Sequence, residues 1–189
     1  MATYTGILFY WVCPSMFSPI PYDAIPHFIG ALFATTFLIP ALSVLILKLS
    51  KRISSLELSN REERILPFFS IACFYGATAY IFHQKLQISS SIINVMIIST
   101  VLIVVLGLVS LKYKISIHAA AIWGLAGIFT SVGQKFLDTS IIPALCGVII
   151  IAGLTSTSRL YLNRHTSIEV WSGSITGFLL CYLCTNFFV

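Results

Sequence analysis

The stretch LQISSSIINVMIISTVLIVVLGLVSL, residues 86–111, decides the fold class of this chain. It contains no Asp, Glu, Lys or Arg, and most of its residues are Ile, Leu or Val. About 20 apolar residues in a helix, at a rise of 1.5 Å per residue, cross a hydrocarbon core of about 30 Å. The stretch therefore predicts a transmembrane helix.

Five further runs of 18 residues or more also lack charged side chains. They cover Ala24–Leu47, Ile65–Phe82, Ile115–Gln134, Thr139–Ser158 and Val170–Val189. No run alternates polar and apolar residues over ten-residue segments, as the strands of a membrane barrel do. The sequence therefore predicts an all-α, polytopic transmembrane helix bundle with six spans, organised as one domain over residues 1–189 with its six-helix core in residues 28–189.

The composition supports this class. Hydrophobic residues make up 58% of the 189 residues, against 11 Lys or Arg and 6 Asp or Glu, and the mean hydropathy is +0.97. A soluble domain has about a quarter of its residues charged, and disordered chains have too little apolar surface to bury. Both classes are excluded. We expect membrane lipids as partners and no nucleic acid.

The first 22 residues are apolar and uncharged but are interrupted by Pro14, Pro19 and Pro21. Proline breaks helices because it lacks an N–H and its ring clashes with the preceding turn. Residues 1–22 therefore predict either a kinked seventh span or a re-entrant segment, and both alternatives remain open.

The cations are unevenly distributed. Threading six spans through a membrane places residues 48–64, 112–114 and 159–169 on one face, with nine of the eleven basic residues: Lys48, Lys51, Arg52, Arg61, Arg64, Lys112, Lys114, Arg159 and Arg164. The positive-inside rule alone would make this face cytoplasmic. That rule accounts for Lys48, Lys51 and Arg52, but it does not explain the histidines beside the other cations.

Two histidines stand among these cations. His118 follows Lys114 by four residues, and His165 precedes Glu169 by four. Residues four apart share a helix face, so we expect Glu169 to reach His165 and Lys114 to stand over His118. Ionisable groups near a bilayer are costly and usually mark a functional site. Two imidazoles with a carboxylate and cations at one face therefore predict a site.

The order Ser158, Arg159, five residues, His165, three residues and an acid at 169 resembles the third signature of the type 2 phosphatidic acid phosphatase superfamily, the lipid phosphate phosphatases. Ser116, Ile117 and His118 are similar to part of its second signature. The resemblance implies a helical membrane phosphatase, and the chain departs from it in two ways. Glu169 stands where the family has Asp, and the lysine, six residues, arginine, proline signature is absent.

The resemblance implies specific roles. His165 would be the nucleophile that forms a phosphohistidine, Glu169 would hold its imidazole, and His118 would donate a proton to the leaving oxygen. A phosphate needs fixed cations around its oxygens, and arginine offers a planar fork of donors. We expect the phosphate-binding residues to be Arg159, Ser116, Lys114, Arg64 and Arg61.

The function expected is a metal-independent lipid phosphate or diphosphate phosphatase with no cofactor. Its substrate would be a lipid phosphate or polyprenyl diphosphate entering from the bilayer, and its place would be the inner, cytoplasmic membrane of a bacterium. Two alternatives remain. One is an inactive relative that binds anionic lipids or acts as a scaffold, and the other is a small transporter. The sequence does not indicate the oligomeric state.

Overall fold

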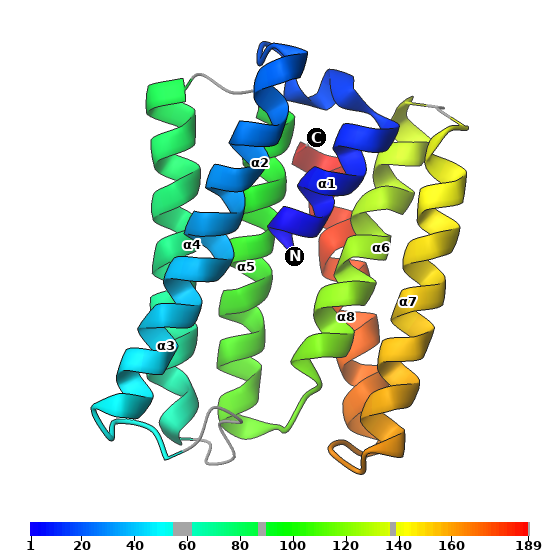
Figure 1. Cartoon of the computed structure of the whole chain (residues 1–189). Helices are drawn as coiled ribbons and strands as arrows, with labels where there is room; N and C mark the ends of the chain where they lie inside the picture. Colours follow the sequence, from blue (N-terminus) through cyan, green and yellow to red (C-terminus); the bar gives the residue numbers. More distant parts are fainter. Residues whose placement is uncertain (55–61, 87–89, 137–138, 189) are drawn as a thin grey trace.

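The computed structural model describes residues 1–54, 62–86, 90–136 and 139–188, and every regular element in these ranges is helical, as predicted. The long elements stand side by side in an upright bundle (Figure 1). They are α4 (Ile65–Leu86), α5 (Ser90–Lys112), α6 (Ile117–Phe136), α7 (Ile141–Tyr161) and α8 (Ser167–Phe188), together with a broken helix that runs from α2 (Ile25–Phe33) through the π-helical turn η3 (Ala34–Leu38) into α3 (Ile39–Leu49).

Five helices in the described part of the chain are long and apolar enough to cross a membrane: Tyr22–Leu49, Ile65–Lys85, Ser90–Lys112, Ile141–Tyr161 and Ser167–Phe188. The protein is therefore an integral membrane protein of the helical class. The predicted sixth span corresponds to α6, which is not among the five. Its 20 residues include many Ala and Gly, because it lies in the bundle interior, where its neighbours approach closely.

The break in the first long helix has a local cause. Pro40 has no N–H and cannot donate to the carbonyl of Thr36, four residues earlier. The backbone accommodates the missing bond in the π turn η3, where the N–H of Ile39 instead reaches the carbonyl of Ala34. The helix continues on both sides, so residues 22–49 form one candidate span.

The N-terminal segment forms α1 (Ala2–Val12), followed by the short 3₁₀ turns η1 (Pro14–Phe17) and η2 (Tyr22–Ala24). α1 ends where the residue before Pro14 is forced out of the helical region, with Cys13 at φ −144° and ψ 67°. At 1.5 Å per residue, 11 residues extend for roughly 16 Å, about half of a hydrocarbon core. α1 is too short to be the seventh span.

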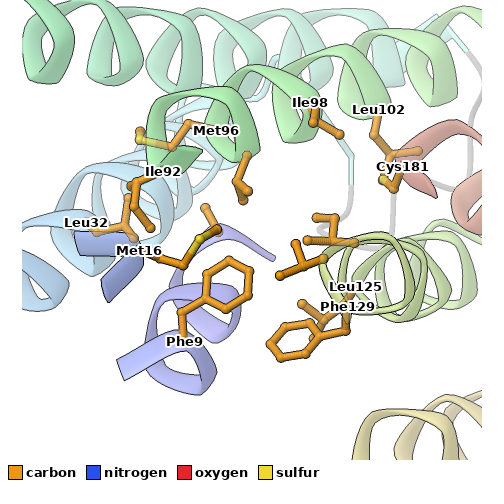
Figure 2. Close-up of a cluster of buried hydrophobic side chains, with 14 of the residues drawn as sticks. Phe9, Met16, Leu32, Ile92, Met96, Ile98, Leu102, Leu125, Phe129 and Cys181 are labelled. Atoms are coloured by element: carbon orange, nitrogen blue, oxygen red, sulfur yellow. The ribbon is translucent and has the colours of Figure 1, made fainter. Parts of the chain in front are cut away.

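α1 instead packs against the bundle through one face, which includes Phe9, and leaves Tyr4 and Trp11 exposed on the other. It stands between α2 and α5 on one side and α6 on the other (Figure 1). The Phe9 ring is fully buried and stacks on Phe129 of α6 with ring centroids 4.9 Å apart. Figure 2 shows this pair next to Leu125, facing Met96 and Leu102 of α5. The short helix thus links the side chains of α5 with those of α6 in the hydrophobic core.

α6 and α8 make the closest helix contact, and glycines permit it. A Cβ at Gly173 would lie 2.6 Å from the carbonyl oxygen of Ser116, and one at Gly177 would collide with the carbonyl of Ala120. From α6, a Cβ at Gly127 would meet the carbonyl of Phe178. The small residues on these two faces therefore let the two backbones touch. Both helices begin at the same end of the bundle (Figure 1).

The helix ends confirm the predicted distribution of charge. The end of α3, both ends of the α5–α6 connection, and the α7–α8 connection lie together at the lower end in Figure 1. Of the nine cations assigned to that face, Arg61 lies outside the described residues. Lys85 and Lys135 fall in the last turns of α4 and α6, at the opposite end. We call the lower end the basic end.

Candidate functional site

The connection between α7 and α8 is shaped by two local motifs. α7 ends in a Schellman motif, in which Asn163 takes the left-handed conformation at φ 51°. The N–H of Asn163 donates to the carbonyl of Leu160 at 2.9 Å, and that of Arg164 to the carbonyl of Arg159 at 3.2 Å. Asparagine tolerates this conformation better than most residues. The turn places His165 directly after α7, facing the start of α8.

α8 begins with a capping box, which the sequence analysis did not identify. The N–H of Thr166 donates to Glu169 Oε2 at 3.2 Å, and the N–H of Glu169 donates to Thr166 Oγ1 at 3.4 Å. A Thr followed three residues later by Glu is a readable signal for this motif. The carboxylate of Glu169 is thereby held at the first turn of α8.

The same carboxylate binds the candidate nucleophile. His165 Nδ1 lies 2.8 Å from Glu169 Oε2, and both side chains are 17% exposed. An ionised Glu169 accepts a hydrogen bond from the N–H at Nδ1, and in this tautomer the lone pair of the ring is on Nε2. The predicted contact between residues 165 and 169 is thus present.

The position of Lys114 differs from the predicted one. It precedes α6, which begins at Ile117, so it does not share a helix face with His118, and the i, i+4 argument was wrong for this pair. Its Nζ instead donates to the carbonyl of Arg164 at 3.0 Å and lies 3.6 Å from Glu169 Oε2. Lys114 therefore fastens the α5–α6 connection to the α7–α8 connection.

Ser116 links the starts of α6 and α8. Its N–H donates to the carbonyl of Glu169 at 3.1 Å, and its carbonyl accepts the N–H of Ala120 at 3.0 Å, which makes it the N-cap residue of α6. Its side chain does not cap the helix. The Ser116 hydroxyl is fully buried and has no hydrogen-bond partner among the described residues.

Arg159 presents a second unpartnered group. It stands in the last turn of α7, and its Nε is buried without a hydrogen-bond partner in the described part of the chain. Arg159 and His165 are both close enough to His118 to act on it electrostatically. Buried polar groups in folded proteins almost always have partners, and among the described residues Ser131 Oγ and Thr185 Oγ1 are the other two without one.

Two cavities flank this cluster. A polar pocket of about 450 Å³ opens at the basic end beside His165, and its wall includes Lys114, Asn163, Arg164 and Thr166. An apolar cavity of about 590 Å³ lies on the membrane side and includes His118 in its wall. The two histidines therefore line different openings.

The structure gathers six of the predicted site residues: His165, Glu169, Lys114, Ser116, His118 and Arg159. No contact between Arg64 and these six residues is among the interactions that the described part of the chain shows. Arg64 is buried in η4 (Glu62–Arg64), which packs against α4 and α5. Its part in binding phosphate stays a prediction. Arg61 lies outside the described residues.

In the described part of the chain, no three His, Cys, Asp or Glu side chains are grouped so that they could hold a metal ion. Comparison of the chain with protein-family models, curated proteins and solved structures gives no match. The function is therefore argued from the geometry of the site.

Proposed function

We propose that the chain is a membrane-embedded lipid phosphate phosphatase, a divergent member of the type 2 phosphatidic acid phosphatase superfamily. The observation that carries the proposal is the 2.8 Å contact between His165 Nδ1 and Glu169 Oε2, beside two buried polar groups without partners, Ser116 Oγ and Arg159 Nε. An oriented imidazole beside unfilled donors is the arrangement that phosphoryl transfer to a side chain needs.

In the first step, Nε2 of His165 attacks the phosphorus, and the bond from phosphorus to the lipid oxygen breaks. The proton on Nδ1 stays with the imidazole, whose growing positive charge Glu169 stabilises. His118 gives a proton to the departing lipid oxygen. Arg159, Ser116 and the first N–H groups of α6 surround the phosphoryl oxygens, since a helix start attracts anions.

In the second step, water attacks the phosphohistidine. His118, having lost its proton, takes one from the water, and the bond between phosphorus and Nε2 breaks. Inorganic phosphate leaves through the polar pocket at the basic end, and His118 regains the protonation state it began with. The proposed cycle uses side chains of this chain and no metal ion.

The same proposal includes the number of membrane spans. α6 is the sixth span, because its 20 residues run parallel to α8 through the bundle from the basic end. The substrate enters from the bilayer as a lipid phosphate or a polyprenyl diphosphate. The membrane proposed is the cytoplasmic membrane of a bacterium, to which the compact form of this superfamily belongs.

The test is phosphate release from lipid phosphates by purified protein in detergent without added metal. His165→Ala is expected to fold and to lose nearly all turnover, because the nucleophile is gone. The matched control is His83→Ala, which makes the same change in the last turn of α4 at the opposite end. A His165→Ala protein that retains most of the rate refutes the proposal.

A second candidate is a non-catalytic protein that binds anionic lipid head groups. It is favoured by the structural contacts of Glu169, which caps α8 and pairs with Lys114 at 3.6 Å whether or not a reaction occurs. This candidate predicts saturable binding of phosphatidate without release of phosphate, and equal binding by His165→Ala and the wild type. Measured turnover excludes it.

A further inference from the structure

The apolar cavity on the membrane side is lined by the N-terminal helix α1 and by the consecutive helices α6 and α7. Its volume is about 590 Å³, in the range of sites that hold small organic ligands. No charged side chain lines it among the described residues. The wall is formed by Met1, Tyr4, Ile7, Leu8, His118, Ala121, Ile122, Leu125, Ala144, Gly147, Val148, Ile151 and Thr155.

Each helix contributes one face. On α6 the lining positions are 118, 121, 122 and 125, and on α7 they are 144, 147, 148, 151 and 155, so both follow the spacing of a single helical stripe. Continued by one more turn, the α7 stripe reaches Arg159. The α6 stripe starts at His118. Both stripes therefore run from the hydrocarbon interior into the candidate phosphate site.

The cavity has the shape of a channel along the helices. Residues 144 and 155 of α7 are separated by roughly 16 Å at 1.5 Å per residue, about half of the hydrocarbon core. The α1 helix, with Tyr4, Ile7 and Leu8, forms the wall away from α6 and α7. Trp123 Nε1 donates to Ser156 Oγ at 3.2 Å and joins α6 to α7 near the site end of this channel.

We propose that this cavity holds the hydrocarbon chain of the lipid whose phosphate lies at His118 and Arg159, an inference that rests on the proposed function. The chain of a membrane lipid is already in hydrocarbon, so the cavity contributes alignment rather than transfer from water. A chain held against α6 and α7 keeps the ester oxygen at the level of His118, where it must accept a proton. Hydrocarbon chains long enough to contact the wall that α1 forms are aligned best.

Gly147 offers a direct way to fill the cavity. A Cβ placed on it meets no atom within 4 Å, although the residue lines the cavity. Gly153, on the same helix, also has open space around its Cβ but does not belong to the wall. Gly147→Leu therefore blocks the channel, and Gly153→Leu is a control with the same substitution on the same helix.

The test compares phosphate release from hexadecyl phosphate and butyl phosphate. Gly147 lies roughly 18 Å along α7 from Arg159, so only the long chain reaches it. We expect Gly147→Leu to lower kcat/KM for hexadecyl phosphate at least about tenfold and to leave butyl phosphate unchanged. Gly153→Leu should preserve the wild-type ratio. If Gly147→Leu leaves the ratio of the two substrates unchanged while both are hydrolysed, the cavity is not the chain site.

A binding measurement separates this inference from the proposed function. Hexadecyl phosphate carrying a diazirine at the chain end should label α1, α6 or α7 of the wild type, and Gly147→Leu should lose this labelling. Unlabelled hexadecyl phosphate should compete, and hexadecanol should not. Labelling of this kind without any phosphate release supports the site and refutes the phosphatase. Equal competition by hexadecanol refutes the site.

Discussion

Single side chains at the start of α8 combine a structural role with a chemical one. Glu169 caps the helix through Thr166 and holds the imidazole of His165 through one oxygen, Oε2. The two roles are separable, because the cap needs only an acceptor oxygen, whereas a histidine nucleophile needs the negative charge.

Glu169→Gln keeps an acceptor for the N–H of Thr166 but removes the charge. We expect kcat to fall by roughly 10²-fold, in the range that a positioned acid or base contributes, with little change in thermal unfolding. Thr166→Ala should do the opposite. It should cost about 1 kcal/mol of stability through the lost cap and leave kcat near the wild-type value. Equal losses of activity in the two variants would show that Glu169 only caps α8.

Replacing Ser116 is expected to have an unusual effect on the free energy of unfolding. Its buried hydroxyl has no partner among the described residues, so Ser116→Ala removes an unsatisfied polar group and should leave the free energy of unfolding unchanged or raise it by up to about 1 kcal/mol. The KM for a lipid phosphate should rise roughly tenfold or more, because a hydrogen bond to a charged group is worth about 1.5–3 kcal/mol.

The comparison variant for Ser116 is Ser174→Ala. Its hydroxyl is also buried but donates to the carbonyl of Val170 at 2.9 Å, one turn away on α8. Loss of that bond should lower stability slightly and leave KM unaffected. Urea or thermal unfolding in detergent, together with steady-state kinetics, distinguishes the two variants. A clear destabilisation by Ser116→Ala would contradict the prediction.

Among the helices, the α6–α8 pair builds the site. The close approach at Gly173 and Gly177 places the N-cap of α6 against the first turn of α8, where the N–H of Ser116 meets the carbonyl of Glu169. Residues on two helices far apart in sequence are thus joined through their backbones. The contact depends on the absence of side chains at the glycines.

Gly173→Ala introduces a Cβ that would lie 2.6 Å from the carbonyl oxygen of Ser116. We expect it to destabilise the protein by about 1–3 kcal/mol, the usual cost of overpacking, and to reduce activity because Ser116 moves away from Glu169. Gly76→Ala on α4 is the control, since its Cβ meets nothing within 4 Å. That variant should be as stable as the wild type or more so. Thermal unfolding of both variants in detergent checks the pair, and equal stabilities would argue against the close contact.

The molecule as a whole carries most of its cations at one end, the end where α6 and α8 begin and α7 ends. The proposal that α6 crosses the membrane together with the five candidate spans agrees with this arrangement. Because α6 is the most enclosed of the long helices, it needs less hydrophobicity than those that face lipid on one side.

Cysteine labelling tests the crossing. In a cysteine-free background, Tyr113→Cys precedes α6 and Phe136→Cys ends it, and both positions are exposed. A membrane-impermeant thiol reagent should reach them from opposite sides of sealed vesicles. Ser54→Cys, on the basic end, should label from the same side as Tyr113→Cys. Labelling of positions 113 and 136 from one side would exclude α6 as a span.

Much of the fold followed from local features of the sequence. The lengths of the uncharged runs predicted the long helices to within a few residues, and the spacing of the cations predicted which connections share an end. The contact between His165 and Glu169 was predicted, but not its cause, because His165 precedes α8 and the carboxylate is held by the capping box with Thr166. The capping box was equally predictable from the spacing of Thr166 and Glu169. The sequence prediction instead assigned Glu169 to His165 alone.

The sequence by itself determined that this protein is a helical membrane bundle with a basic end, because hydrophobic length and charge act along the chain. Only the tertiary structure decided that Lys114 reaches Glu169 instead of His118, that Arg64 packs with α4 and α5, and that the Ser116 hydroxyl has no partner among the described residues. It also enclosed a cavity behind the short α1 helix. These features depend on which helix faces pack against each other. Small residues on several helices together determine that packing.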